Sequence, residues 1–259
     1  MCSSLGLRFA GKAHVMDEPI SNSVMRAKRL IINADDFGWS RGISDGILLA
    51  HREGIITSTT LMVNQPASQY ALELASQAPK LGVGIHLRLC DGFPVLAPSQ
   101  VRSLVDQEGK FYSISETRRR LWRGRVSGEE IEAEFRAQIR WMKDRGRVPT
   151  HADSHHYIHL HPQVFGPFCR ALRLEGIRRF RSPYQTCWPR DGRMWNGHGG
   201  SIGRRFSVAA YMRLLRFCSR DLASPDSWVD AAPQFRGNLD LLGEGWKRLV
   251  DNMPREPLN

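Results

Sequence analysis

Two adjacent carboxylates, Asp35 and Asp36, follow a run of mainly apolar residues that begins at Arg29. Burying unpaired charge is costly, so such a pair needs a metal, another cation or a catalytic use. The structural alternative is that Asp36 caps a turn while Asp35 pairs with an arginine. Neighbouring strand residues point to opposite sides, but at a frayed strand end both carboxylates can reach one pocket. One aspartate could then bind a metal while the other accepts a proton.

Histidines supply the other candidate ligands. His86 lies in the segment GIHL at 84–87, and alone it would more often be a core histidine than a ligand. Segment 153–161, DSHHYIHLH, places four histidines within seven residues, which packing does not readily explain. One aspartate with two neutral imidazoles is a sound ligand set for a divalent cation and leaves positions open for water and substrate. Ligand type alone allows zinc, magnesium, manganese or iron.

The elements that must position these residues alternate in type. Short apolar or β-branched runs predict strands, and helical periodicity with capping signals predicts the helices between them. The predicted strands are 29–34, 55–63, 81–87, 150–154 and 177–180, and the predicted helices are 44–53, 69–77, 127–146 and 163–175. The third helix has the strongest signals, because Ser127 and Glu130 have the spacing of a capping box. The turn-rich segment 91–124 is interpreted as an insertion that lines substrate. Repeated strand–helix units predict an α/β fold, with a barrel or partial barrel favoured over an open doubly wound sheet.

Composition excludes several functional classes. Hydrophobic residues make up 41% and charged residues 24%, which is typical of a soluble globular protein, and residues 29–259 are expected to form a single domain after a disordered or non-native extension at 1–28. Neither a run of about 20 apolar residues nor a signal-like apolar core occurs, so we expect no membrane span. Five dispersed cysteines without a CxxC pair predict free thiols and a cytoplasmic location. The excess of 37 Lys and Arg over 26 Asp and Glu would attract anions, but without a nucleic-acid-binding motif we expect no nucleic-acid partner.

With these residues in place, the chain resembles the YdjC-like carbohydrate deacetylases. The match lies in four ordered motifs, which are NADDFG at 33–38, GIITSTT at 54–60, GIHL at 84–87 and THADSHH at 150–156. The resemblance runs from about Leu30 to Pro183 and more loosely to the end of the chain. It implies an irregular TIM-like (β/α) barrel, a divalent cation usually described as magnesium, and deacetylation of N-acetylated oligosaccharides such as chitooligosaccharides.

Carried onto this sequence, the resemblance makes Asp36, His86 and His155 the metal ligands and Asp35 the general base. Magnesium is the favoured cation and zinc the alternative. Such a cation polarises the acetyl carbonyl and lowers the pKa of a bound water, while Asp35 removes the proton. The predicted sugar-binding residues are Trp39, which follows the NADDFG motif, Tyr157 and His159, with Trp122 a weaker candidate for stacking. A homodimer is compatible with the sequence, which does not fix the oligomeric state.

The C-terminal region departs from the family pattern. Relatives usually carry a Cys-His-Pro segment in a late strand, and its histidine is a natural acid for the leaving amine, whereas this chain reaches Asn259 without one. Residues 246–254 resemble the helix before that strand, so we expect a truncated end and an incomplete barrel. Otherwise His159, His161 or His198 would supply the acid. Two other functions stay open, namely a catalytically weak metal- or sugar-binding relative and a metal-dependent phosphohydrolase.

Overall fold

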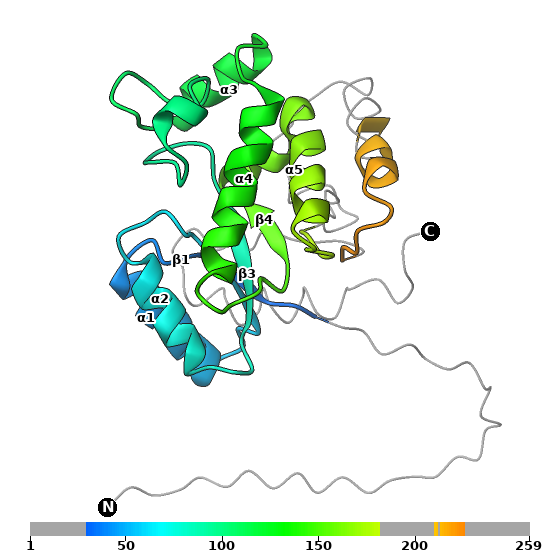
Figure 1. Ribbon diagram of the computed structural model, residues 1–259. Coiled ribbons are helices and arrows are strands. Elements are labelled where there is room, and N and C mark those ends of the chain that lie inside the picture. The colour runs from blue at the N-terminus through cyan, green and yellow to red at the C-terminus, as the bar shows by residue number, and fades with distance from the viewer. Residues whose placement is uncertain (1–29, 182–209, 212, 226–259) are drawn as a thin grey trace, which may run out of the picture. The chain divides into compact units, whose positions relative to one another are not determined.

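The computed structural model describes residues 30–181, 210–211 and 213–225 (Figure 1). From Ile31 onward the described residues belong to one compact unit. The predicted extension at 1–28, His198 and the predicted helix at 246–254 lie outside the described residues. The elements follow the chain as β1 (Asn33–Phe37), α1 (Arg41–Arg52), β2 (Ser58–Leu61), α2 (Ser68–Ser76), β3 (Gly82–Leu87), the 3-10 helix η1 (Pro98–Gln100), α3 (Ile114–Trp122), α4 (Gly128–Lys143), β4 (Ala152–Ser154), the 3-10 segment η2 (His155–Leu160) and α5 (Pro162–Leu174).

The strands of the described residues form a four-stranded sheet in the order β1-β2-β3-β4, and every neighbouring pair is parallel. Parallel neighbours need crossover connections, which α1 supplies between β1 and β2 and α2 supplies between β2 and β3. The predicted α/β alternation is therefore confirmed. The predicted strand at 177–180 is reduced to isolated parallel bridges, one joining Ala152 to Phe180 and another joining Arg179 to Ala223. Within the residues described, the sheet does not close into a barrel.

Strand β1 lies further along the chain than its apolar run predicted, so both aspartates are inside the strand. The register of β1 against β2 shifts between Ala34 and Phe37, and Asp36 adopts a left-handed backbone with φ 65°. Aspartate tolerates this conformation better than most residues, and a bulge of this kind re-aims a side chain. Gly38 then turns the chain at φ 89°, where a Cβ atom would lie 2.9 Å from the Met62 carbonyl oxygen. The bulge replaces the frayed end expected from the sequence.

Helix α4 confirms the strongest helical signal but only half of its capping box. The Ser127 hydroxyl accepts a hydrogen bond from the Glu130 amide at 3.3 Å. The Glu130 carboxylate does not return to Ser127. It accepts from the backbone amide and the hydroxyl of Ser103, each at 2.7 Å, while the Ser127 amide donates to the Ser103 hydroxyl at 2.9 Å. Glu130 thus ties the 91–124 segment to α4, and that segment itself contains α3, whose cap is Ser113.

The core forms between the sheet and the helices around it. Helices α4 and α5 lie side by side (Figure 1), and the Phe135 ring meets the Phe168 ring edge-on with centroids 6.1 Å apart. The periodic apolar residues of α4 that the sequence singled out are buried, namely Ile131, Phe135, Ile139 and Met142.

Among the described cysteines, Cys90, Cys169 and Cys218 are free thiols. No helix in the described part of the chain is long and apolar enough to cross a membrane.

Candidate metal centre and active site

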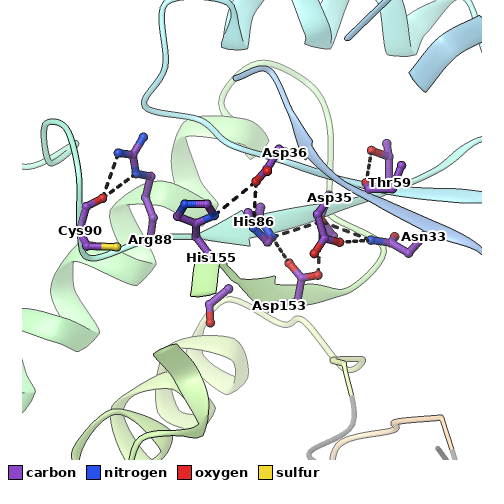
Figure 2. Close-up of polar contacts among 12 residues, drawn as sticks. Asn33, Asp35, Asp36, Thr59, His86, Arg88, Cys90, Asp153 and His155 are labelled. Carbon is purple, nitrogen blue, oxygen red and sulfur yellow. Dashed lines mark hydrogen bonds and ion pairs between the residues drawn. The ribbon is translucent and has the colours of Figure 1, made fainter. Parts of the chain in front are cut away.

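The three predicted metal ligands come together at the carboxyl ends of parallel strands (Figure 2). Asp36 lies in β1, His86 in β3, and His155 directly follows β4. Oδ1 of Asp36 is 3.4 Å from Nε2 of His86 and 3.3 Å from Nδ1 of His155. One donor atom from each of the three residues lies within 4.8 Å of the other two. Segments more than 100 residues apart therefore offer one shared point to a ligand, as the sequence predicted.

The Asp36 carboxylate has the character of an unsatisfied ligand. Its Oδ1 atom is buried and has no hydrogen-bond partner among the described residues, although two imidazole nitrogens are close. Burial opposes ionisation of Asp36, but the neighbouring His155 and His86 lower its pKa well below the ordinary value. The side chain does not cap the following turn, where only the Asp36 backbone carbonyl accepts from the Trp39 amide at 3.0 Å. A cation between the three donors would satisfy this orphaned oxygen.

A buried carboxylate, Asp153, fixes the orientation of His86. Oδ1 of Asp153 lies 2.6 Å from Nδ1 of His86, and the exposed fractions of the two side chains are 0% and 2%. The Thr60 hydroxyl donates to the other Asp153 oxygen at 3.3 Å. Because an ionised carboxylate only accepts hydrogen bonds, Nδ1 of His86 is the donor and Nε2 is directed toward Asp36. Such outer carboxylates commonly orient the histidines that bind metals.

The charges of this pair reinforce each other. Burial disfavours the charged form of His86, but Asp153 raises the pKa of His86 to about 10. Burial also opposes ionisation of Asp153, whose pKa is nevertheless lowered by Arg181 and His86. Without a cation, His86 therefore carries protons on both ring nitrogens at neutral pH. A metal ion that bound at Nε2 would therefore have to displace the proton on that nitrogen.

Asp35, the predicted base, is held by an arginine that the sequence analysis did not identify. Nη1 of Arg181 donates to Oδ2 of Asp35 at 2.9 Å, and Nη2 contacts Oδ1 of Asp35 as well as Oδ2 of Asp153, the latter at 2.6 Å. The side-chain amide of Asn33 donates through Nδ2 to Oδ1 of Asp35 at 2.8 Å. The structural alternative is thus correct in one respect, because Asp35 does pair with an arginine. The same contacts fix the carboxylate beside the candidate ligands (Figure 2).

The net charge of these contacting groups favours a divalent cation. The contacts join three carboxylates, Asp35, Asp36 and Asp153, to one guanidinium, that of Arg181, and to two imidazoles. A bound cation requires both imidazoles to be neutral, and two negative charges in this group then lack a balancing positive charge other than the cation. Buried or half-buried charge is costly unless it is paired, so a divalent cation fits both the charge and the donor types.

The chain after His155 turns sharply and separates the two adjacent histidines. His156 and Tyr157 both adopt a left-handed backbone with φ 54°, which is uncommon for residues other than glycine. His156 is exposed and groups with Cys90 and Asp91 instead of Asp36. Burial raises the pKa of Cys90 to about 12, so its thiol is protonated and a poor ligand. His155 is therefore the histidine of the pair that faces the candidate metal centre.

The structure separates the residues that were predicted to contact sugar. Trp39 is 40% exposed, and its ring centroid lies 5.6 Å from that of His155, so it borders the centre. Tyr157 is half-buried with its ring beside the Arg181 guanidinium. His159, in contrast, is completely buried, stacks on Phe168 and has Nδ1 2.5 Å from the Ser154 hydroxyl.

This burial corrects the assignments made for His159. Burial lowers the pKa of His159 to about 3, so the imidazole is neutral at physiological pH. A neutral side chain without solvent access can neither contact a sugar nor deliver a proton to the leaving amine. His159 is removed from both roles that the sequence analysis gave it.

The fold and the candidate site together define a parallel α/β protein in which an aspartate, two histidines and an adjacent carboxylate meet at the carboxyl ends of the strands. The sequence model of the YdjC-like protein family matches residues 29–257, and the chain belongs to this family. The resemblance inferred from the four motifs is thereby confirmed.

Similar proteins agree with this assignment. A carbohydrate deacetylase of Halalkalibacterium halodurans is 46% identical over 198 residues, covering 73% of this chain and 80% of that protein. A carbohydrate deacetylase of Brevibacillus brevis is 44% identical over 162 residues, covering 62% of this chain and 60% of that protein. A solved structure of an Enterococcus faecalis protein, provisionally named a cellobiose-phosphate cleavage protein, is 31% identical with a TM-score of 0.65, covering 85% of this chain and 74% of that one.

Proposed function

We propose that this protein is a metal-dependent carbohydrate deacetylase that removes acetyl groups from N-acetylated sugars of the chitooligosaccharide type. The observation that carries the proposal is the convergence of Asp36, His86 and His155 beside the fixed carboxylate of Asp35. The names of the similar proteins in Halalkalibacterium halodurans and Brevibacillus brevis support the same activity.

The residues divide the chemistry among themselves. Asp36, His86 and His155 would hold a divalent cation, for which the family resemblance favours magnesium, while two imidazole ligands also suit zinc. When bound, such a cation lowers the pKa of a coordinated water and polarises a carbonyl group. Trp39, exposed at the edge of the site, would pack against the apolar face of the acetylated ring.

Asp35 retains the capacity to act as the base. Each carboxylate oxygen offers about two acceptor positions. Among the described residues, Oδ1 accepts hydrogen bonds from Asn33 and Arg181, whereas Oδ2 accepts one, from Nη1 of Arg181. The remaining position on Oδ2 would accept the proton of the attacking water, and Arg181 would keep the carboxylate oriented during the transfer.

The strand order supports the irregular TIM-like barrel as the complete fold. In a (β/α) barrel the strands follow one another in chain order, whereas a doubly wound sheet reverses direction at a switch point. The order β1-β2-β3-β4 contains no reversal, and the bridges from Ala152 to Phe180 and from Arg179 to Ala223 continue it in the same direction. Catalytic residues at the carboxyl ends of strands are also the rule in such barrels.

The function can be tested by measuring acetate and phosphate release side by side. Protein loaded with magnesium, manganese or zinc is incubated with N-acetylated mono-, di- and oligosaccharides and with sugar phosphates. We expect acetate and free amine in equal amounts, and loss of both in His86→Asn. The matched control is His51→Asn, because His51 is a half-buried histidine outside the candidate site whose Nδ1 atom lies 2.8 Å from the Ile56 carbonyl. Phosphate release without acetate would favour a phosphohydrolase, and sugar binding without either product would favour a catalytically weak relative.

A further inference from the structure

A cavity of about 520 Å³ lies next to the candidate metal centre. Its walls come from the end of α3, from η2 and from the helical segment around Tyr211, and its lining includes Arg118, Trp122, His156, Tyr157, His161 and Tyr211. His156 and Tyr157 directly follow the candidate ligand His155, and the rings of His155 and His156 are 4.0 Å apart. Two residues that line the cavity are therefore the direct chain neighbours of the candidate metal ligand His155.

The aromatic walls of the cavity suit the flat apolar face of a sugar ring. Trp122, the last residue of α3, is 70% exposed, and its ring meets His161 edge-on with centroids 4.6 Å apart. The Tyr211 hydroxyl donates to the Leu160 carbonyl at 2.7 Å, which holds the Tyr211 ring at the wall. Because most of the Trp122 side chain is exposed, a ligand that packs on it would bury additional aromatic surface.

Polar groups at the same walls suit hydroxyl groups. Nδ1 of His161 accepts from the Gln163 amide at 3.3 Å, so in the neutral ring Nε2 carries the hydrogen. That Nε2 is buried and has no hydrogen-bond partner among the described residues. Arg118 uses one nitrogen to donate to the His156 carbonyl at 3.4 Å, and a guanidinium offers five N–H donors. A ligand with oxygen acceptors would satisfy donors of Arg118 that a purely apolar ligand would leave unpaired.

We propose that this cavity is a second sugar subsite, which binds the next pyranose ring of an N-acetylated oligosaccharide whose acetylated ring lies at the metal centre. Trp122 packs on the face of that second ring, with the His161 ring supporting Trp122 from the side, and Arg118 donates to the oxygens of the sugar. This assignment rests on the proposed function, because it extends the same substrate away from the acetyl group. It makes Trp122 a residue that sets the preference for chain length.

The test compares substrates of increasing length on the full, cation-loaded protein. The kcat/KM for acetate release is measured with N-acetylglucosamine and its di- and trisaccharides, and calorimetry measures binding of the same sugars independently of turnover. Relative to its effect on the monosaccharide, Trp122→Ala should lower kcat/KM and affinity for the longer sugars roughly tenfold, the scale of one aromatic contact. Trp122→Phe keeps a flat ring and should recover part of the loss. Phe217→Ala is the matched control, because Phe217 is 65% exposed and is not among the residues that line the cavity.

The outcomes separate the subsite from the proposed function. Length-dependent binding that Trp122→Ala abolishes, without acetate release from any sugar, would support the subsite and contradict the deacetylase. Acetate release that Trp122→Ala reduces equally for all lengths, or not at all, would overturn the subsite and leave the deacetylase intact. If Trp122→Ala weakens binding of an alkyl glycoside of N-acetylglucosamine but not binding of the oligosaccharides, the cavity binds an alkyl chain and the sugar assignment is wrong.

Discussion

Replacing Asp153 by asparagine tests how the buried outer carboxylate supports the metal centre. Asp153 does not face the proposed cation, but its 2.6 Å contact with Nδ1 of His86 orients that ring and raises the pKa of His86 to about 10. Asp153→Asn keeps the shape and one acceptor oxygen for Nδ1 of His86, but it removes the negative charge and places an NH2 group where Thr60 and Arg181 now donate. Arg181 keeps its contacts with Asp35, so no buried guanidinium is left unpaired.

Two opposing effects determine how much Asp153→Asn changes the affinity for the cation. Without Asp153, the pKa of His86 falls, so less proton competition would favour the cation. The carboxylate, however, also attracts the cation, which carries twice the charge of the proton that it displaces, so a net loss remains. Loss of an outer carboxylate typically weakens metal binding about 10- to 100-fold, or roughly 1.4 to 2.7 kcal/mol. We expect a loss in this range at pH 7.

The pH dependence gives a sharper signature than affinity alone. His86 of the wild-type protein is protonated below pH 10, so cation binding should release a proton from His86 and strengthen as pH rises from 7 toward 10. In Asp153→Asn this release should be largely lost at pH 8. Calorimetry of zinc or manganese binding in buffers of different ionisation enthalpy measures both quantities. Glu134→Gln, which changes a buried carboxylate that binds the Val95 and Leu96 amides, controls for general destabilisation. Equal affinity and equal proton release in Asp153→Asn and wild type would show that Asp153 does not support cation binding through His86.

Three further predictions follow from the contacts around the centre. Asp35→Asn should lower kcat by roughly two to four powers of ten while calorimetric metal affinity persists, and unchanged turnover would remove Asp35 from the mechanism. Arg181→Lys cannot reproduce the two-pronged contact with Asp35, so kcat should fall more than KM rises, whereas a change in KM alone would contradict a positioning role. Burial lowers the pKa of His159 to about 3, so between pH 6.5 and 3 the unfolded chain binds a proton that the folded chain excludes, and stability must fall as pH falls. From pH 8 to 5 this loss is about 2 kcal/mol, and urea unfolding of His159→Asn should show a weaker pH dependence than wild type.

The sequence was sufficient to predict which three residues converge, because their signals are local. Parallel strands bring their carboxyl ends to one edge, so polar residues at the ends of the predicted strands were expected to meet, and Asp36, His86 and His155 do. The boundary of β1 was placed too early, because an apolar run indicates a buried strand but contains no signal for a bulge. The positive φ of Asp36 depends on the packing of β1 against β2.

The supporting residues were beyond sequence reasoning for a different reason. Arg181 contacts Asp35 across 146 positions, and nothing in its neighbourhood distinguishes it from the other arginines of a basic chain. Asp153 was visible within the histidine motif, and its position two residues before His155 was the signal that could have identified it. His159 shares that motif but turns into the core, because η2 packs against α5 and the His159 ring stacks on Phe168 of that helix. Side-chain direction in an irregular segment depends on tertiary packing, so histidine spacing alone could not separate the ligand from the core residue.

The position of the bound metal tests the central claim most directly. Crystals of the full chain grown with manganese, and separately with zinc, would locate the ion by its anomalous scattering. We expect one ion within about 2.0 to 2.3 Å of donor atoms of Asp36, His86 and His155, with Asp153 hydrogen-bonded to His86 and not coordinated. An ion held by Cys90, Asp91 and His156, or by Asp35 and Asp153, with none between the three predicted ligands, would contradict this expectation.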